Sequence, residues 1–313
     1  MVQRINAAVF GTVVGGQSEY RKRIKEMLPG LINDNKVELV LFPGWEIIKF
    51  MEVDSLAGLS AGDQLLEEAF QEELLSFYQE LARCLQAFVG VNLPIREGEN
   101  CFNRAYLLDI DGAILGSQDQ IHLQPWAKSA GLAEGKEVKV MDTPFGRLGF
   151  ILGADNFYPE VGRILALKGA ELILAPTIYL PPYNPWDQLA GIWQVVQQNQ
   201  FFALENPANL ILRNAQVQGM PAIYGPCDIT PEETGFLAGP DNLGISGPNR
   251  YLNQAEDFTS KLLAEKGSYF FHAELNFADL ERARAQFPIR DLFNRELYRE
   301  KLVYDSPAGG EKS

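Results

Sequence analysis

The residues of this 313-residue chain that could perform covalent chemistry are few and far apart. It has three cysteines, Cys84, Cys101 and Cys227, and two histidines, His122 and His272. An odd number of distant cysteines without a Cys-x-x-Cys pair fits a reducing compartment. Two histidines are too few for a histidine-rich metal site. We therefore expect neither a metal ion nor a cofactor.

The stretch at 140–160, VMDTPFGRLGFILGADNFYPE, is where we expect a site to be built. It predicts a hairpin, a buried strand that ends at Gly153, and a helix that begins at Pro159. Asp155 can accept backbone N–H groups in the turn after the strand. Glu160 lies in the first turn of the helix, where a negative charge is favourable. Both acidic residues are interpreted as structural.

The elements that would position this stretch alternate between strands and helices, which indicates an α/β fold. Apolar runs predict strands at 6–14, 37–42, 87–93, 103–110, 113–117, 138–143, 147–152, 172–175, 210–213 and 268–276. Helical spacing and cap signals predict helices at 60–86, 159–168, 186–206 and 277–286, and one that Ser18 caps and Pro29 ends. The Pro-, Gly- and Thr-rich segment 220–240 is predicted to be a long loop.

The charge of the chain excludes several classes of partner. Its net charge is −14, so nucleic acids and anionic membrane surfaces are poor partners. No apolar run reaches the roughly 18–20 residues that span a bilayer, and the run at 7–14 is interpreted as a strand rather than a signal peptide. We expect a cytoplasmic protein.

The order of these segments resembles the nitrilase superfamily, the carbon–nitrogen hydrolases of nitriles and amides. The segments that carry the resemblance are 37–43, 103–123, 142–149, 155–160, 169–176, 203–214 and 244–248. The resemblance implies a four-layer αββα sandwich of two mixed sheets, in agreement with the strand and helix alternation. It also implies one domain at 1–288, followed by a C-terminal arm and disordered tail at 289–313. Members associate through helical faces and this arm, so we expect a homodimer or a larger assembly.

The resemblance also implies a catalytic set that this chain lacks. In the family a cysteine attacks carbon, a glutamate moves protons and a lysine stabilises negative charge. The positions that match glutamate, lysine and cysteine are Gly44, Gln120 and Gly153. Because such residues act as a unit, three replacements together predict the loss of the thiol chemistry.

Two residues could restore part of this chemistry. Glu46 lies two residues beyond Gly44, although a loop glutamate at a strand end is the simpler interpretation. Cys227 lies in the predicted loop at 220–240, in surroundings that do not favour a thiolate. Cys84 is expected near the buried stripe of its helix, as a small hydrophobic residue, and Cys101 in a setting that disfavours a thiolate.

The remaining site residues suggest a pocket for a neutral ligand. Two glycines delete side chains from the floor, which leaves room for a ligand, for water or for neighbouring aromatic rings. The candidates for the pocket are Trp45, Asp155, Tyr158 and Tyr179, with Gln120 as donor and acceptor. The aromatic residues are equally consistent with a packed core. For His122 we expect a packed, hydrogen-bonded ring rather than a general base.

The leading prediction is therefore a catalytically silent member that binds a small neutral molecule or serves as a regulatory or interaction subunit. A divergent hydrolase of an amide, carbamoyl or nitrile substrate is the first alternative, with Glu46 or an unexpected residue restoring catalysis. A structural assembly subunit with a collapsed site is the second. Residue types alone leave the three open.

Overall fold

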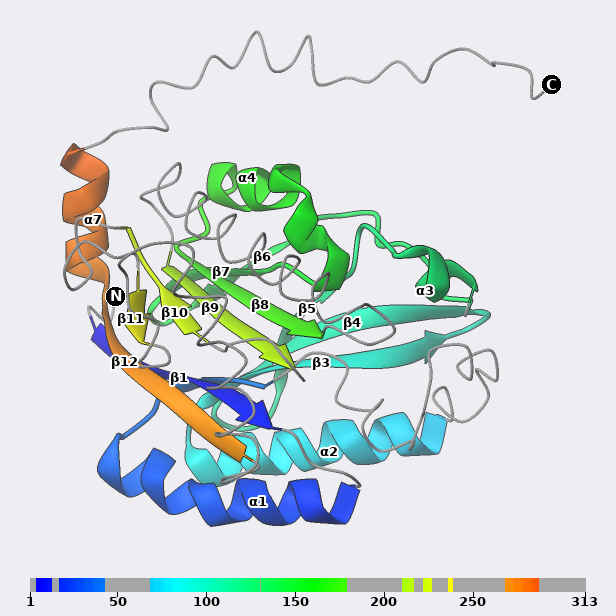
Figure 1. Cartoon of the computed structure of the whole chain (residues 1–313), viewed down its shortest axis with the longest axis horizontal. Coiled ribbons are helices and arrows are strands. Elements are labelled where there is room, and N and C mark those ends of the chain that lie inside the picture. The colour runs from blue at the N-terminus through cyan, green and yellow to red at the C-terminus, as the bar shows by residue number, and fades with distance from the viewer. Residues whose placement is uncertain are drawn as a thin grey trace, which may run out of the picture.

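Two six-stranded sheets form the centre of the molecule in the computed structural model (Figure 1). The structure describes residues 4–12, 17–42, 68–129, 131–178, 210–216, 222–226, 236–238 and 268–286. One sheet has the order β12-β1-β2-β3-β4-β5 and the other β11-β10-β9-β8-β7-β6. Both mix parallel and antiparallel pairs, as β1 pairs antiparallel with β12 and parallel with β2.

The strands of the first sheet are β1 (Arg4–Thr12), β2 (Leu39–Leu41), β3 (Phe88–Glu97), β4 (Asn100–Leu108), β5 (Ile114–Asp119) and β12 (Ser268–Asn276). Those of the second are β6 (Val140–Thr143), β7 (Gly146–Phe150), β8 (Leu172–Ile178), β9 (Leu210–Gln216), β10 (Ala222–Tyr224) and β11 (Phe236–Ala238). Antiparallel hairpins join β3 to β4, β4 to β5 and β6 to β7, and the turn residues predicted the last two of them.

Helices cover the outer faces of the sheets (Figure 1). The described helices are α1 (Gln17–Pro29), with a π-helical turn at Gly30–Asp34, α2 (Glu68–Leu85), α3 (Pro125–Ser129), α4 (Pro159–Leu167) and α7 (Phe277–Gln286). Figure 1 shows α1 and α2 together beside the first sheet, and α4 beside the second. The four layers are therefore helices, sheet, sheet and helix, which confirms the expected αββα sandwich.

The central strands are buried on both faces, and alternate side chains enter different layers of the core. On β1, Ala7 and Val9 pack between the two sheets, whereas Ala8 and Phe10 pack under α1 and α2. On β8, Leu172 and Leu174 enter the layer between the sheets, and their neighbour Ile173 packs against α4. A period of two in uninterrupted apolar runs thus accounts for three stacked cores.

Two details of the sequence-based expectation are wrong. The segment 220–240 is not a structureless loop, because β10 and β11 lie within it and pair with each other. These strands have three residues each, too short for a periodic signal, and pairing rather than local propensity forms them. Helix α1 begins at Gln17, one residue before the expected cap Ser18, so the helix starts earlier than expected.

Other expectations lie outside the described residues, namely the helix at 186–206 and the arm and tail at 289–313. Within the described part of the chain, no helix is both long enough and apolar enough to cross a membrane.

Candidate functional site

The candidate site lies where two chain segments leave their strands. Gln120 follows β5, the edge strand of the first sheet, and Gly153 follows β7 in the second. Gly153 opens a 3-10 turn, Gly153–Phe157, which leads into α4. Because the two sheets pack face to face, these strand ends meet, and the two positions become neighbours although 33 residues separate them.

Gly153 has a backbone that favours glycine, and Gln120 lies against it. The φ angle of Gly153 is +47°, in the left-handed region. A Cβ built there would lie 3.0 Å from Nε2 and 3.2 Å from Oε1 of Gln120. The space that the missing side chain leaves is therefore partly filled by the Gln120 amide. Of the occupants that were expected for this space, the structure places the Gln120 amide beside Gly153, while Gly44 lies outside the described residues.

A chain of buried amides holds Gln120 in this position. Nδ2 of Asn92 donates to Oδ1 of Asn103 at 2.7 Å, and Nδ2 of Asn103 donates to Oε1 of Gln120 at 2.6 Å. Nε2 of Gln120 donates in turn to the carbonyl oxygen of His122 at 2.7 Å. All three amide side chains are at most 3% exposed. The sequence analysis missed Asn92, for which a polar residue inside the apolar run 87–93 was the available signal.

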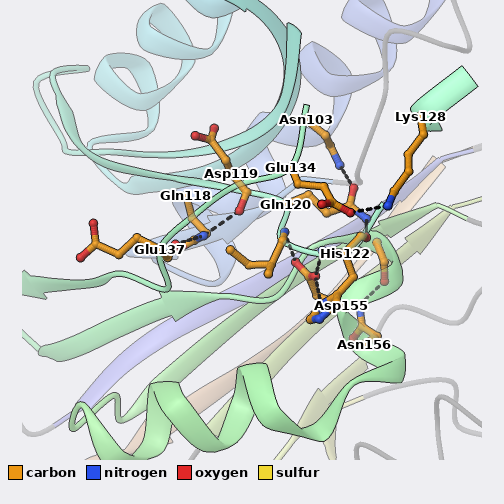
Figure 2. Close-up of polar contacts among 12 residues, drawn as sticks. Asn103, Gln118, Asp119, Gln120, His122, Lys128, Glu134, Glu137, Asp155 and Asn156 are labelled. Carbon is orange, nitrogen blue, oxygen red and sulfur yellow. Dashed lines mark hydrogen bonds and ion pairs between the residues drawn. The ribbon is translucent and has the colours of Figure 1, made fainter. Parts of the chain in front are cut away.

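Asp155 connects the two segments of the site (Figure 2). It is 1% exposed, and its carboxylate accepts the backbone N–H groups of Ile121 at 3.1 Å and His122 at 2.7 Å. Its structural role was expected, but its donors come from the segment after β5 and not from its own turn. Burial raises the pKa of Asp155, and the hydrogen bonds from His122 and Ile121 oppose this shift.

His122 is fixed by contacts on two sides. Its Nδ1 lies 2.9 Å from Oδ1 of Asp155, and its ring stacks on Tyr158 with centroids 3.8 Å apart and planes at 11°. The His122 side chain is 33% exposed and Tyr158 is 45% exposed. Tyr158 therefore covers one face of the His122 ring at the surface and does not fill an interior pocket.

An ion pair lies beside His122 on the segment after it (Figure 2). Nζ of Lys128 lies 2.6 Å from Oε1 of Glu134, and both side chains are about half exposed. The hydrogen bond from Lys128 lowers the pKa of Glu134, and the charge of His122 acts in the same direction. Gln118 fixes the rest of this segment by bonding to the backbone of Glu137 and Lys139.

The structure brings together only some of the predicted site residues. Gln120, Gly153, Asp155 and Tyr158 lie within one cluster, joined by His122. Gly44, Trp45, Glu46, Tyr179 and Cys227 lie outside the described residues. Glu160 is exposed in the first turn of α4, as expected.

The two described cysteines lie in different layers. Cys101 is buried in β4, two residues before Asn103. Cys84 is exposed near the end of α2, so it does not pack as the small hydrophobic residue that was expected. The stripe at Leu74, Tyr78, Leu81 and Leu85 faces the sheet, and Cys84 falls beside it on the helix. The described residues contain no group of His, Cys, Asp and Glu side chains suited to a metal ion.

Gly153→Ala is expected to lower the free energy of unfolding by about 1–2 kcal/mol. A methyl group would meet the Gln120 amide, which is hydrogen-bonded at both ends and cannot move freely. Urea denaturation would measure the change. Gly98→Ala is the matched control, since its φ is +63° and no atom lies within 4 Å of its Cβ. Equal losses in the two variants would show that Gln120 does not crowd position 153.

Comparisons with known proteins agree on one family. The carbon–nitrogen hydrolase family model matches residues 9–230. The chain is 28% identical over 189 residues to a citrullinase from Francisella tularensis, an alignment that covers 56% of this chain and 64% of that protein. It is 27% identical over 168 residues to N-carbamoylputrescine amidase of Arabidopsis thaliana, an alignment that covers 52% of this chain and 56% of that protein. The chain thus spans less than two thirds of these relatives.

A solved structure extends the likeness over nearly the whole chain. The carbon–nitrogen hydrolase from Helicobacter pylori G27 superposes with a TM-score of 0.75 at 18% identity. The alignment covers 96% of this chain and 99% of that one. At this identity the likeness concerns the fold, the nitrilase-like sandwich of two mixed sheets.

Proposed function

Because this chain belongs to the carbon–nitrogen hydrolase family, we propose that its site takes a small amide, carbamoyl or nitrile compound. We further propose that it hydrolyses a carbon–nitrogen bond without a thiol at position 153. The observation that carries the proposal is the pairing of Gly153 with the buried amide of Gln120, 3.0 Å from the place of a Cβ. An intact, ordered site remains there, but neither residue supplies a nucleophile or a positive charge.

The chemistry of Gln120 supports a neutral polar ligand. Its Nε2 carries two hydrogens, and one of them is bonded to the carbonyl of His122. The second can donate to a carbonyl oxygen that lies over Gly153, which has no side chain of its own. Asn103 fixes the amide orientation, so this donor is held in place before a ligand arrives.

The names of the relatives support hydrolysis rather than binding alone. A citrullinase and an N-carbamoylputrescine amidase are named for compounds that carry a carbamoyl group on nitrogen. Such a group presents one carbonyl oxygen and N–H donors, which a neutral amide side chain can recognise. Carbamoyl compounds are therefore the first class to test.

A silent binding or regulatory protein is the second candidate. The residue types at Gly153 and Gln120 favour it, since the family's reaction depends on a thiolate and an ammonium group at these positions. In this reading the same ligand class is held and not cleaved. Self-association and a cytoplasmic location remain predictions under either candidate.

The experiment is to incubate the purified full chain with citrulline, an N-carbamoyl amine, a simple amide and a nitrile. Released ammonia measures hydrolysis, and titration calorimetry measures binding. Ammonia above the protein-free rate supports the first candidate. Binding without ammonia release supports the silent binding or regulatory protein. If the chain shows neither ammonia release nor binding, the structural assembly subunit is favoured.

The thiol-free part of the proposal has its own test. A variant with serine at Cys84, Cys101 and Cys227 is expected to retain the ammonia release of the wild-type chain. Near- and far-ultraviolet circular dichroism would confirm that the variant is folded. Loss of turnover in the single variant Cys227→Ser, with Cys84→Ser unchanged as the control, would show that a loop thiol performs the chemistry.

A further inference from the structure

The site contains a buried carboxylate beside a partly exposed imidazole, an arrangement that Gly153 does not require. Asp155 is 1% exposed, and the His122 side chain is 33% exposed. Oδ1 of Asp155 and Nδ1 of His122 are 2.9 Å apart. A carboxylate can only accept, so an ionised Asp155 places the ring proton on Nδ1. This tautomer leaves the lone pair of Nε2 free to accept a proton.

The surroundings of Nε2 of His122 are consistent with its accepting a proton. Within the described residues, Nε2 of His122 makes no hydrogen bond. Tyr158 stacks on one face of the ring and limits its rotation. The charged groups near the ring are Glu134 and its partner Lys128, on the segment that follows His122. The ring is therefore oriented by Asp155 and Tyr158, with its second nitrogen available.

The pair of His122 and Asp155 lies directly beside Gln120 and Gly153. His122 lies two residues after Gln120, and Asp155 lies two residues after Gly153. The Gln120 amide donates to the carbonyl oxygen of His122 itself, so the two side chains share one short segment. Figure 2 shows the side chains of Gln120, His122 and Asp155 gathered between the two strand ends.

We propose that His122, held by Asp155, is the proton acceptor of this site and activates the water that attacks the substrate carbon. The inference rests on hydrolysis as the proposed function. Nε2 takes a proton from water as the oxygen bonds to the carbonyl carbon. The carbon–nitrogen bond then breaks, and the same proton passes from His122 to the leaving nitrogen. Asp155 stays ionised and stabilises the imidazolium that exists between the two steps.

The first test needs no substrate. The chain has two histidines, and His272 lies exposed on β12, so it serves as an internal reference. Proton–nitrogen correlation spectra of the chain labelled in its histidines are expected to show His122 protonated on Nδ1 and bare on Nε2. Asp155→Asn is expected to change this pattern while His272 keeps its own. A proton on Nε2 of His122 in the wild-type chain at neutral pH would overturn the proposal.

The second test uses ammonia release from the carbamoyl compound that the wild-type chain cleaves. His122→Gln is expected to lower kcat by at least about 100-fold, and His272→Gln to leave it unchanged. The loss of rate on the acid side of the pH profile should disappear in His122→Gln. Imidazole added to His122→Ala should restore part of the rate, which a merely structural role of His122 would not allow.

The outcomes separate this inference from the proposed function. Ammonia release that persists in His122→Gln overturns the role of His122 and leaves hydrolysis standing. No release by the wild-type chain overturns hydrolysis, and the water-activating role is then overturned with it.

Discussion

Asp155→Asn is expected to lower the free energy of unfolding by about 2–3 kcal/mol, measured by urea denaturation at neutral pH. The Asp155 carboxylate accepts three N–H groups, from the backbone of Ile121 and from the backbone and ring of His122. An asparagine side chain has one oxygen and one NH₂ group. In either orientation its NH₂ group faces at least one buried donor, which then loses its hydrogen bond.

Asp142→Asn is the matched control, because the Asp142 side chain on β6 is 87% exposed. Its ion pair with Arg147 is a surface pair, worth at most about 1 kcal/mol. We expect this variant to stay within about 0.5 kcal/mol of the wild-type chain. A loss in Asp155→Asn no larger than that in Asp142→Asn would contradict the assigned hydrogen-bond pattern.

The pH dependence follows from the direction of the Asp155 pKa. Burial raises this pKa, so the folded chain holds the proton more tightly than the unfolded chain does. The stability that results is fully present below the pKa of Asp155 in the unfolded chain, about 3.9. It is lost as the pH rises through the pKa of Asp155 in the folded chain. The gap in unfolding free energy between the wild-type chain and Asp155→Asn should therefore narrow as the pH rises from about 4 to 7. A gap that widens over this range would contradict the raised pKa.

Asn103→Leu is expected to cost about 2–5 kcal/mol, since it breaks the buried amide chain in its middle. The substitution keeps the approximate volume but removes the acceptor of Asn92 and the donor to Gln120. Both partners are buried, so water does not easily replace the lost bonds. Thermal and urea unfolding would measure the loss.

Asn100→Leu is the control for Asn103→Leu, because Asn100 is exposed on the same strand and should change stability by no more than about 0.5 kcal/mol. A double-mutant cycle with Gln120→Leu would then isolate the bond between Asn103 and Gln120. The double variant should lose less than the sum of the two single losses. Strict additivity would mean that the 2.6 Å contact contributes no coupling.

Much of the architecture could be predicted because it depends on local patterns. The runs at β2 and β8 are apolar at nearly every position, which is typical of strands buried on both faces. The hairpin turn between β4 and β5 and the start of α4 at Pro159 also have short-range signals. By contrast, β10 and β11 form only because β9 provides a pairing edge, which no window of sequence reveals.

Some features of the candidate site also follow from the sequence, and others depend on the fold. The residue types at Gln120 and Gly153, and with them the absence of a thiol and an ammonium group there, follow from the sequence alone. So does the acidic character of the chain, on which the expectation that nucleic acid is a poor partner rests. These are properties of single positions or of the total charge, and they do not depend on how the chain folds.

Only the tertiary structure decided which groups meet. The donors to Asp155 lie more than 30 residues away along the chain, at Ile121 and His122. The row from Asn92 to Gln120 joins two strands and the segment after a third. Hydrogen bonds act over about 3 Å, so their partners are set by sheet pairing and sheet packing rather than by neighbours in sequence. For this reason the sequence determines which side chains stand at positions 120 and 153, whereas the fold decided that His122 and Asp155 stand together beside them.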